Sequence, residues 1–165
     1  MWPDTYSLSA PKTQPEARWP VKGSYVLLIR LTQGQTIRVG LRSVHFPGGY
    51  YAYVGSALGG LKARLRRHLK ADKKRYWHID YLLEKAAING IIIAETQDRI
   101  ECHIAQELGL KFDPVPGFGS SDCNCPSHLF FSLDEEKIES AARSAFSSLA
   151  IKPSLVRILP RAIPQ

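Results

Sequence analysis

The stretch that decides the fold is GGYYAYVGSALGGLKARLRRHLK, residues 48–70, in which an aromatic segment is followed by glycines and then by a basic segment. The aromatic and β-branched residues of its first half are typical of a β-strand. In its second half Leu61, Leu65 and Leu69 recur at intervals of four residues, the spacing of one apolar helix face. The stretch therefore predicts a strand, a glycine turn and an amphipathic helix in succession.

Three tyrosines within four residues raise the question of what their phenols do. Because side chains alternate along a strand, we expect Tyr51 and Tyr53 on one face and Tyr50 on the other. One set can then pack in the core while the other meets a ligand. Two interpretations stay open at this point: aromatic packing on a half-buried strand, or a site in which phenolic hydroxyls meet a phosphate.

Periodic patterns on both sides of this stretch predict a single α/β (α+β) domain with a small, mainly antiparallel central sheet flanked by helices. The first three strands are separated by glycine-containing breaks, which predicts an antiparallel meander. Strands are expected at residues 24–31, 35–40, 49–55, 89–95 and 128–133, and helices at residues 61–69, 76–87, 98–108 and 134–149, with Asp98 as the N-cap of the third helix.

The domain is expected to span residues 23–149. Residues 1–22 hold four of the eleven prolines and no periodic pattern, so we expect a flexible N-terminal segment. Residues 150–165 contain three more prolines and are expected to form a C-terminal tail. With 165 residues and a hydrophobic content of 44%, the chain is long enough for one domain with its own core.

The chain is basic, with 22 lysines and arginines against 15 acidic residues and a formal net charge of +7. This excess favours a polyanionic partner, nucleic acid before a membrane surface. The apolar runs, such as Ile91–Ala94, are far too short to cross a bilayer. The N-terminus lacks the basic start and apolar block of a secretory signal, so a cytoplasmic location is expected. Three cysteines do not make a disulfide framework in such a reducing compartment.

Eight lysines or arginines and one histidine are concentrated between Lys62 and Arg75. Such a run either forms a solvated helix face or binds along a phosphate backbone. Arg64 and His68 lie four residues apart beside the leucine stripe, so they are expected to border the core on one face. A guanidinium there can contact two phosphate oxygens at once, whereas His68 alone is more often structural. The remaining basic residues are candidate DNA contacts: Lys62, Arg66, Arg67, Lys70, Lys73, Lys74 and Arg75.

An acidic residue stands at the edge of the third predicted helix. Glu101 is one residue away from the apolar stripe of Ile100, Ile104 and Leu108. A carboxylate in this place is either a surface residue or a hard oxygen ligand for Mg²⁺ or Mn²⁺. The position alone favours the surface interpretation.

Four short motifs in order resemble those of the GIY-YIG endonuclease superfamily, and within it the Uri-type branch of small stand-alone proteins. The resemblance covers about residues 23–133, with serine in place of the usual aliphatic residue in the first motif. The motifs are Gly23-Ser24-Tyr25, Tyr53-Val54-Gly55, the basic helix LKARLRRH at 61–68, and Arg99-Ile100-Glu101-Cys102.

The resemblance implies a mechanism for each motif residue. Glu101 holds one divalent metal, Mg²⁺ or Mn²⁺, and Tyr25 assists deprotonation of the attacking water. Tyr53 helps to hold the water or the phosphate, and Arg64 stabilises the charge of the pentavalent phosphorane. His68 orients these groups or relays a proton. Because a free phenol has a pKa of about 10, Arg64 and the metal would have to favour the phenolate for Tyr25 to act at neutral pH.

The loop SDCNCPSH, residues 121–128, is expected to fold over this site. Asp122, Ser127 and His128 are candidates for contact with the substrate or with a metal-bound water. His78 and Asp80, two residues apart in the segment WHIDYLL, are interpreted as a local structural pair on the second helix.

The same loop raises the alternative of a zinc site. Cys123, Cys125 and His128 are close in sequence, and Cys102 or His103 would supply a fourth ligand. Structural zinc sites usually separate paired cysteines by two to four residues. Only one residue separates Cys123 from Cys125, so the spacing argues against zinc.

The function expected from the sequence is that of a metal-dependent DNA endonuclease in DNA repair or processing. The runner-up is a non-catalytic nucleic-acid-binding module that retains the nuclease fold, and a small-molecule phosphodiesterase fits the residues but not the basic face. The expected partner is single-stranded or structured DNA, with RNA left open and no membrane. The resemblance also implies association with another DNA-repair protein.

Overall fold

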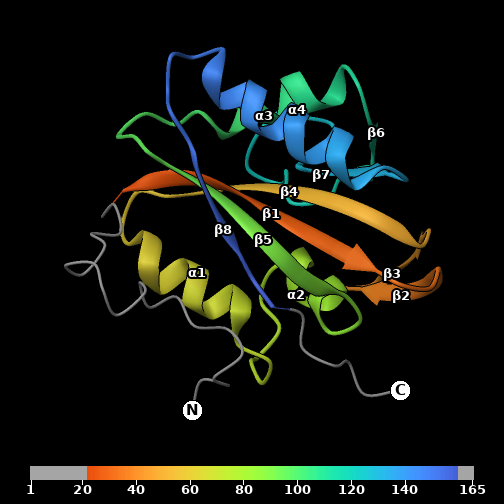
Figure 1. The fold of residues 1–165 in the computed structure, drawn as a ribbon. Helices are drawn as coiled ribbons and strands as arrows, with labels where there is room; N and C mark the ends of the chain where they lie inside the picture. Colours follow the sequence, from red (N-terminus) through yellow and green to blue (C-terminus); the bar gives the residue numbers. More distant parts are fainter. Residues whose placement is uncertain (1–21, 160–165) are drawn as a thin grey trace.

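The computed structural model describes residues 22–159 and contains two sheets and four helices in that range (Figure 1). The strands are β1 (Gly23–Leu31), β2 (Gln35–Val39), β3 (Arg42–Phe46), β4 (Gly49–Ala57), β5 (Ala87–Glu95), β6 (Asp113–Pro114), β7 (Leu129–Ser132) and β8 (Ser154–Arg157). The helices are α1 (Leu61–Leu69), α2 (His78–Leu83), α3 (Glu101–Gly109) and α4 (Glu135–Ser147). The flexible N-terminal segment predicted at 1–22 lies almost entirely outside the described residues.

The main sheet has six strands in the order β6-β7-β4-β1-β5-β8. All neighbouring strands in it are antiparallel, which confirms the predicted α+β class with a mainly antiparallel sheet. Strand β1 lies at the centre and pairs with β4 on one side and β5 on the other. Its nearly continuous apolar sequence fits this place, because a strand covered on both faces has no solvent side for polar residues.

Helices cover both faces of this sheet, α1 and α2 on one face and α3 and α4 on the other (Figure 1). The side chains of β1 alternate between two buried clusters: Tyr25 and Leu27 belong to the first, and Val26 to the second. On β4, Tyr51 and Tyr53 lie in the first cluster, while the neighbouring Tyr50 packs against the second. The predicted division of the three tyrosines is confirmed.

The predicted three-strand meander is wrong. Strand β1 pairs directly with β4, and β2 pairs with β3 in a separate two-stranded sheet. Residues 32–48 therefore fold on themselves as a hairpin inserted between the two tyrosine strands. Gly40 sits in the hairpin turn with φ of 61°, a conformation that glycine adopts without cost. Strand β3, with its largely exposed polar residues, was not predicted from the sequence.

Helices α2, α3 and α4 are shorter than predicted, α4 by one residue at its start and two at its end. Helix α3 begins at Glu101 with Ile100 as its N-cap, so Asp98 is not the cap. The Asp98 backbone N–H instead bonds to the Thr96 hydroxyl at 3.1 Å, in the turn that leaves β5. Helix α2 ends at Leu83 because Ala87 already pairs with β1 as the first residue of β5.

Part of the predicted C-terminal tail is a strand of the sheet. Residues 154–157 form β8, which pairs antiparallel with β5. Arg157 also forms an ion pair of 2.7 Å with Glu139 of α4. The sheet thus extends beyond the predicted boundary at residue 149.

Within residues 22–159 the structure has no helix that is both long and apolar enough to span a membrane.

Candidate functional site

A cavity of about 300 Å³ opens where β1, β4, α1, the first turn of α3 and the loop at residues 115–128 meet. Five residues predicted to act in catalysis line it together: Tyr25, Tyr53, Arg64, His68 and Glu101. They come from four elements and are spread over more than seventy positions of the chain. The four motifs, which are far apart in the sequence, thus meet at one cavity in the fold.

The glycine of the second motif makes room for the tyrosine of the first. Tyr25 and Gly55 are opposite each other on the paired strands β1 and β4. A Cβ atom on Gly55 would lie 2.5 Å from both Cζ and the hydroxyl oxygen of Tyr25. Gly119, at φ of 70°, likewise leaves room for Tyr53, since a Cβ atom there would come within 2.9 Å of the Tyr53 ring. Both phenols can reach the cavity only because these two positions lack side chains.

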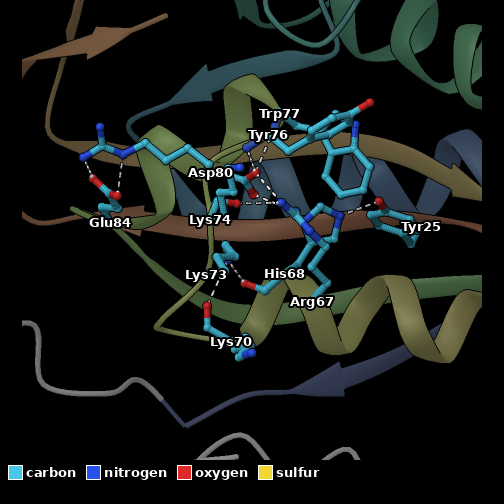
Figure 2. Close-up of polar contacts among 11 residues, drawn as sticks. Tyr25, Arg67, His68, Lys70, Lys73, Lys74, Tyr76, Trp77, Asp80 and Glu84 are labelled. Atoms are coloured by element: carbon cyan, nitrogen blue, oxygen red, sulfur yellow. Dashed lines mark hydrogen bonds and ion pairs between the residues drawn. The ribbon is translucent and has the colours of Figure 1, made fainter.

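Tyr25 and His68 form a buried hydrogen-bonded pair. The Tyr25 hydroxyl lies 2.6 Å from Nε2 of His68, and both side chains are at least 97% buried (Figure 2). Burial raises the pKa of Tyr25, and the nearby Tyr53 raises it further, while Arg64 partly opposes both effects. Burial lowers the pKa of His68 to about 3, and the charge of Lys73 adds to this. The resting pair is therefore neutral at pH 7.

Tyr53 lies beside this pair on β4. Its ring meets His68 edge to face, with the ring centroids 6.1 Å apart. Burial raises its pKa to about 12, although Arg64 lowers it. Tyr53 therefore presents a neutral hydroxyl, which can donate a hydrogen bond, to the cavity.

Arg64 is fixed at the cavity wall by two contacts. It donates a hydrogen bond of 3.2 Å to the backbone oxygen of Ser56, and its guanidinium lies 4.6 Å from the ring centroid of Trp77. The guanidinium of Arg67 also lies over the Trp77 ring, 4.2 Å from its centroid, and Trp77 itself lines the cavity. Such cation–π contacts orient the cation without neutralising it. Trp77 was not predicted as a site residue, although its position directly after the basic run and Tyr76 was a signal in the sequence.

Glu101 contributes the carboxylate of the site. It is the first residue of α3 and lines the cavity. Its Oε2 atom is buried and has no hydrogen-bond partner within residues 22–159. A buried carboxylate oxygen without a partner is costly, and a hard divalent cation such as Mg²⁺ would remove that cost. The surface interpretation of Glu101 therefore does not hold, and the donor fits the metal that the resemblance implies.

Two of the predicted DNA-contacting residues are engaged inside the protein. Arg67 holds the buried Asp80 through two hydrogen bonds of 2.9 and 2.8 Å (Figure 2). Burial by itself raises the pKa of Asp80, but the bonds from Arg67 and the backbone N–H groups of Trp77 and Tyr76 outweigh it, so that the pKa is lowered. Lys73 donates to the backbone oxygen of His68 at 2.7 Å, at the C-terminal end of α1. These two side chains thus stabilise the end of α1 and its contact with α2.

The other predicted DNA contacts lie nearer to solvent. Arg75 pairs with Glu84 at 2.7 and 2.9 Å on the surface. The remaining four are exposed on α1 and on the turn after it: Lys62, Arg66, Lys70 and Lys74.

The predicted pairing of His78 with Asp80 is wrong. Nδ1 of His78 accepts a hydrogen bond of 3.4 Å from the backbone of Gly119, and Asp80 is used by Arg67. Their side chains face different partners because residues two apart on a helix do not share a face. His78 also lines the cavity, so it connects α2 to the loop that closes the site.

The loop at residues 115–128 covers one side of the cavity. Asp122 and His128 line it, as the sequence led us to expect. Ser127 is buried and does not line it: its hydroxyl donates to the backbone oxygen of Leu129 at 3.0 Å. Ser127 therefore shapes the start of β7, while Asp122 and His128 face the site.

The loop also forms a cysteine–histidine cluster with α3. One ligand atom each from Cys102, Cys123, Cys125 and His128 lies within 4.8 Å of the other three. The short spacing of Cys123 and Cys125 therefore does not keep these residues apart, and the group could hold a metal ion. The loop passes through turns and bends at residues 121–128, and on this path one intervening residue is enough to bring Cys123 and Cys125 together. His103, the other candidate, turns instead toward Glu107 at 4.0 Å.

Burial favours the neutral forms of Cys102 and His128 in this cluster. Burial raises the pKa of Cys102 to about 12, and its hydrogen bonds with the two other thiols raise it further. Burial lowers the pKa of His128, although Glu101 and Asp122 both raise it.

Comparisons with known proteins agree with the motifs. No curated protein and no solved structure matches the chain. A family model described as a domain of unknown function, DUF123, matches residues 24–151, which is most of the chain and covers the whole cavity lining. The protein therefore belongs to the DUF123 family, a family of GIY-YIG-like domains.

Proposed function

We propose that the protein is a metal-dependent endonuclease that hydrolyses phosphodiester bonds in DNA. One observation carries the proposal: two phenols, an arginine, a neutral histidine and an unpartnered carboxylate line one cavity. Together they can accept a proton, stabilise the negative charge of a phosphate and bind a hard metal ion. A role in DNA repair or processing, with a second repair protein as partner, rests on the resemblance to the Uri-type branch.

Glu101 would hold the Mg²⁺ or Mn²⁺ ion, because its buried Oε2 atom is a hard donor in the cavity wall and has no hydrogen-bond partner within residues 22–159. Such an ion, when bound, supplies positive charge to a phosphate oxygen and lowers the pKa of water. The remaining ligands would be waters and phosphate oxygens, as is usual for Mg²⁺.

Tyr25 and His68 act as one proton acceptor. A free phenolate is unfavourable in this buried place, because burial raises the pKa of Tyr25. In the His68 tautomer that leaves Nε2 without a hydrogen, the Tyr25 oxygen can take a proton from the attacking water while its own proton passes to Nε2, 2.6 Å away. The negative charge of a bound phosphate would raise the pKa of His68, which burial lowers, and so favour this transfer. The water oxygen bonds to phosphorus as the bond between phosphorus and the leaving oxygen breaks, and the leaving oxygen takes a proton from solvent. One proton has moved from water to imidazole, and Tyr25 is neutral before and after.

Arg64 and Tyr53 face the negative charge that develops on phosphorus. The guanidinium of Arg64 is held by Trp77 and the Ser56 backbone, so it needs little reorganisation to bind two phosphate oxygens. The neutral hydroxyl of Tyr53 adds a hydrogen-bond donor.

Surface charge supports nucleic acid as the substrate. The exposed lysines and arginine on α1 and the following turn, together with the net charge of +7, can neutralise a phosphate backbone. Tyr76 lies at the rim of the cavity and is 79% exposed. An exposed aromatic ring beside basic residues is suited to stack on an unpaired base, which favours single-stranded or structured DNA over a plain duplex.

A non-catalytic binding module would keep the basic surface but has no use for Glu101. A carboxylate in a site that binds phosphate repels its ligand unless a cation lies between them. The unpartnered Glu101 oxygen therefore favours the enzyme.

The test is cleavage of end-labelled single-stranded, duplex, flapped and branched DNA by the wild-type protein with Mg²⁺, Mn²⁺ or EDTA. The proposal predicts strand scission of at least one substrate that depends on the metal. Parallel reactions with RNA of the same sequence decide between the two nucleic acids. Tight, salt-sensitive binding without scission of any substrate would contradict the enzyme and favour the binding module.

A further inference from the structure

We infer that Cys102, Cys123, Cys125 and His128 bind a Zn²⁺ ion at a structural site separate from the ion proposed at Glu101. The inference does not depend on the nuclease activity, because it rests on another set of side chains. Its function would be to hold the loop at residues 115–128 against the first turn of α3.

The cluster has the dimensions of a tetrahedral zinc site. With zinc bonds of about 2.1 Å to nitrogen and 2.3 Å to sulfur, neighbouring ligand atoms are about 3.6–3.8 Å apart. Nε2 of His128 lies 3.4 Å from Sγ of Cys123 and 3.9 Å from Sγ of Cys102. All four ligand atoms lie within 4.8 Å of one another. Small side-chain adjustments are enough to place them around one ion.

The donor atoms select the metal. Three thiolates and an imidazole suit Zn²⁺, whereas Mg²⁺ and Mn²⁺ prefer the oxygen of a carboxylate such as Glu101. Four protein ligands also fill the tetrahedral coordination of zinc and leave no open position for a reacting water. The site is therefore structural. The cysteine–histidine site would select Zn²⁺, and the carboxylate of Glu101 would select Mg²⁺ or Mn²⁺.

The tip of the loop has few other means to hold its position. Ser121, Asp122, Asn124 and Pro126 are exposed, and the tip lies between the turn of Ser120 and β7. Backbone bonds anchor the loop mainly at its base, where His128 N–H donates to Phe118 at 2.8 Å. A loop with such an exposed, polar tip has a large conformational entropy when free. Zinc ligation by Cys123 and Cys125 would fix the tip directly.

The same ligation reaches the proposed catalytic residues. Cys102 is next to Glu101 in the first turn of α3, and His128 and Asp122 line the cavity. The backbone oxygen of His128 also accepts a hydrogen bond of 2.9 Å from Val54, inside the second motif. The ion would thus join three parts of the cavity wall: α3, the loop and β4.

The first test is the zinc content of protein made in zinc-containing medium and purified in reducing buffer without chelator. Elemental analysis should find about one zinc per chain for a closed four-ligand site. Cys123→Ser and Cys125→Ser should each lose most of it. His103→Ala removes the histidine next to Cys102, outside the cluster, and should retain full zinc. Full zinc in both serine variants would overturn the ligand assignment.

A second measurement uses only the wild-type chain, in case the serine variants fail to fold. Apo-protein that circular dichroism shows to be folded is titrated with Co²⁺. Thiolate-to-cobalt charge-transfer bands and intense tetrahedral visible bands should appear, and about one equivalent of Zn²⁺ should abolish them. A reduced, folded protein that gives neither zinc nor this spectrum overturns the inference. So does a disulfide between two of the three cysteines in freshly purified protein.

Failure of this inference is distinguishable from failure of the proposed function. Glu101→Ala should retain its zinc, because Glu101 is outside the cluster. A protein that binds zinc but does not cut DNA would leave the zinc site standing and refute the nuclease.

Discussion

At the scale of single residues, the Tyr25 phenol occupies space that any side chain on Gly55 would need. The contact explains why a tyrosine and a glycine far apart in the sequence belong to one site. It also means that the pocket tolerates very little change in volume, because closely packed interiors cannot absorb an added methyl group without strain.

Replacing Gly55 with alanine should therefore destabilise the protein by about 1–3 kcal/mol, the usual cost of overpacking, and displace Tyr25 from His68. Urea unfolding followed by circular dichroism measures the first effect. Gly59→Ala is the matched control, since a Cβ atom on Gly59 meets nothing within 4 Å. Equal stability of the two variants would show that Tyr25 does not lie where we describe it.

The proton relay predicts a specific loss in Tyr25→Phe. This variant keeps the ring but removes the hydroxyl that bonds to His68. Single-turnover cleavage should fall on the order of 100-fold or more at every pH tested, as for loss of a general base. Tyr50→Phe, on the opposite face of β4, should cleave like wild type. Unchanged rates in Tyr25→Phe across a pH series would remove Tyr25 from the mechanism.

His68 should make stability depend on pH. Its pKa is lowered from the ordinary 6.5 to about 3 by burial, so between these values the unfolded chain binds a proton that the folded protein excludes. The free energy of unfolding should therefore fall as pH decreases from 6.5 toward 3, and His68 should add nothing to this slope above that window.

Urea midpoints at a series of pH values measure this dependence. In His68→Gln the slope should be shallower by up to about 1.4 kcal/mol per pH unit. His45→Gln, an exposed histidine on β3, should leave the slope unchanged. Identical slopes for wild type and His68→Gln would mean that His68 is not buried in its neutral form.

At the scale of elements, Asp80 connects α1, α2 and the turn between them. It accepts hydrogen bonds from Arg67 on α1 and from two backbone N–H groups at the start of α2 (Figure 2). The position of Trp77, and through it of Arg64, depends on this junction. Arg64, Arg67 and Lys73 of the basic run thus help to build the site, whereas Lys62, Arg66, Lys70 and Lys74 lie exposed.

Removing the charge of Asp80 should be costly. Asp80→Asn leaves the guanidinium of Arg67 without its buried counter-ion, which typically costs about 3–5 kcal/mol. Glu84→Gln breaks the exposed pair with Arg75 and should have little effect, as surface ion pairs usually do. Thermal or urea unfolding compares the two variants, and a similar loss in both would contradict the central place given to Asp80.

The elements that sequence patterns predicted well are those whose buried face can be recognised from the spacing of apolar residues within the element itself. Strands β1 and β4 and helix α1 carry apolar residues at the spacing of their own geometry. Strands β3 and β8 were missed because they are short and half exposed, and only a partner strand makes them strands. The approach of the three cysteines and His128 was not predicted for a related reason: Cys102 and Cys123 are on different elements, and the distance between them depends on the path of the whole loop.

At the scale of the whole molecule, the sheet separates two packed layers, and the cavity lies where elements from both layers meet. Tyr25, Tyr53, Arg64 and His68 come from the layer of α1, and Glu101 comes from α3 on the other face (Figure 1). In the proposed mechanism, the proton acceptor and the phosphate-binding groups would thus come from one side of the sheet and the metal ligand from the other. A scissile phosphate would be held between them.

The most direct measurement is the single-turnover cleavage rate of wild type, Glu101→Gln and Glu107→Gln with Mg²⁺, after fluorescence anisotropy has shown similar DNA affinities. Glu107 is on the same helix and outside the cavity, so it controls for general effects on α3. The account predicts metal-dependent cleavage by wild type and Glu107→Gln, and a loss on the order of 100-fold or more in Glu101→Gln. Cleavage by Glu101→Gln at the wild-type rate would contradict it.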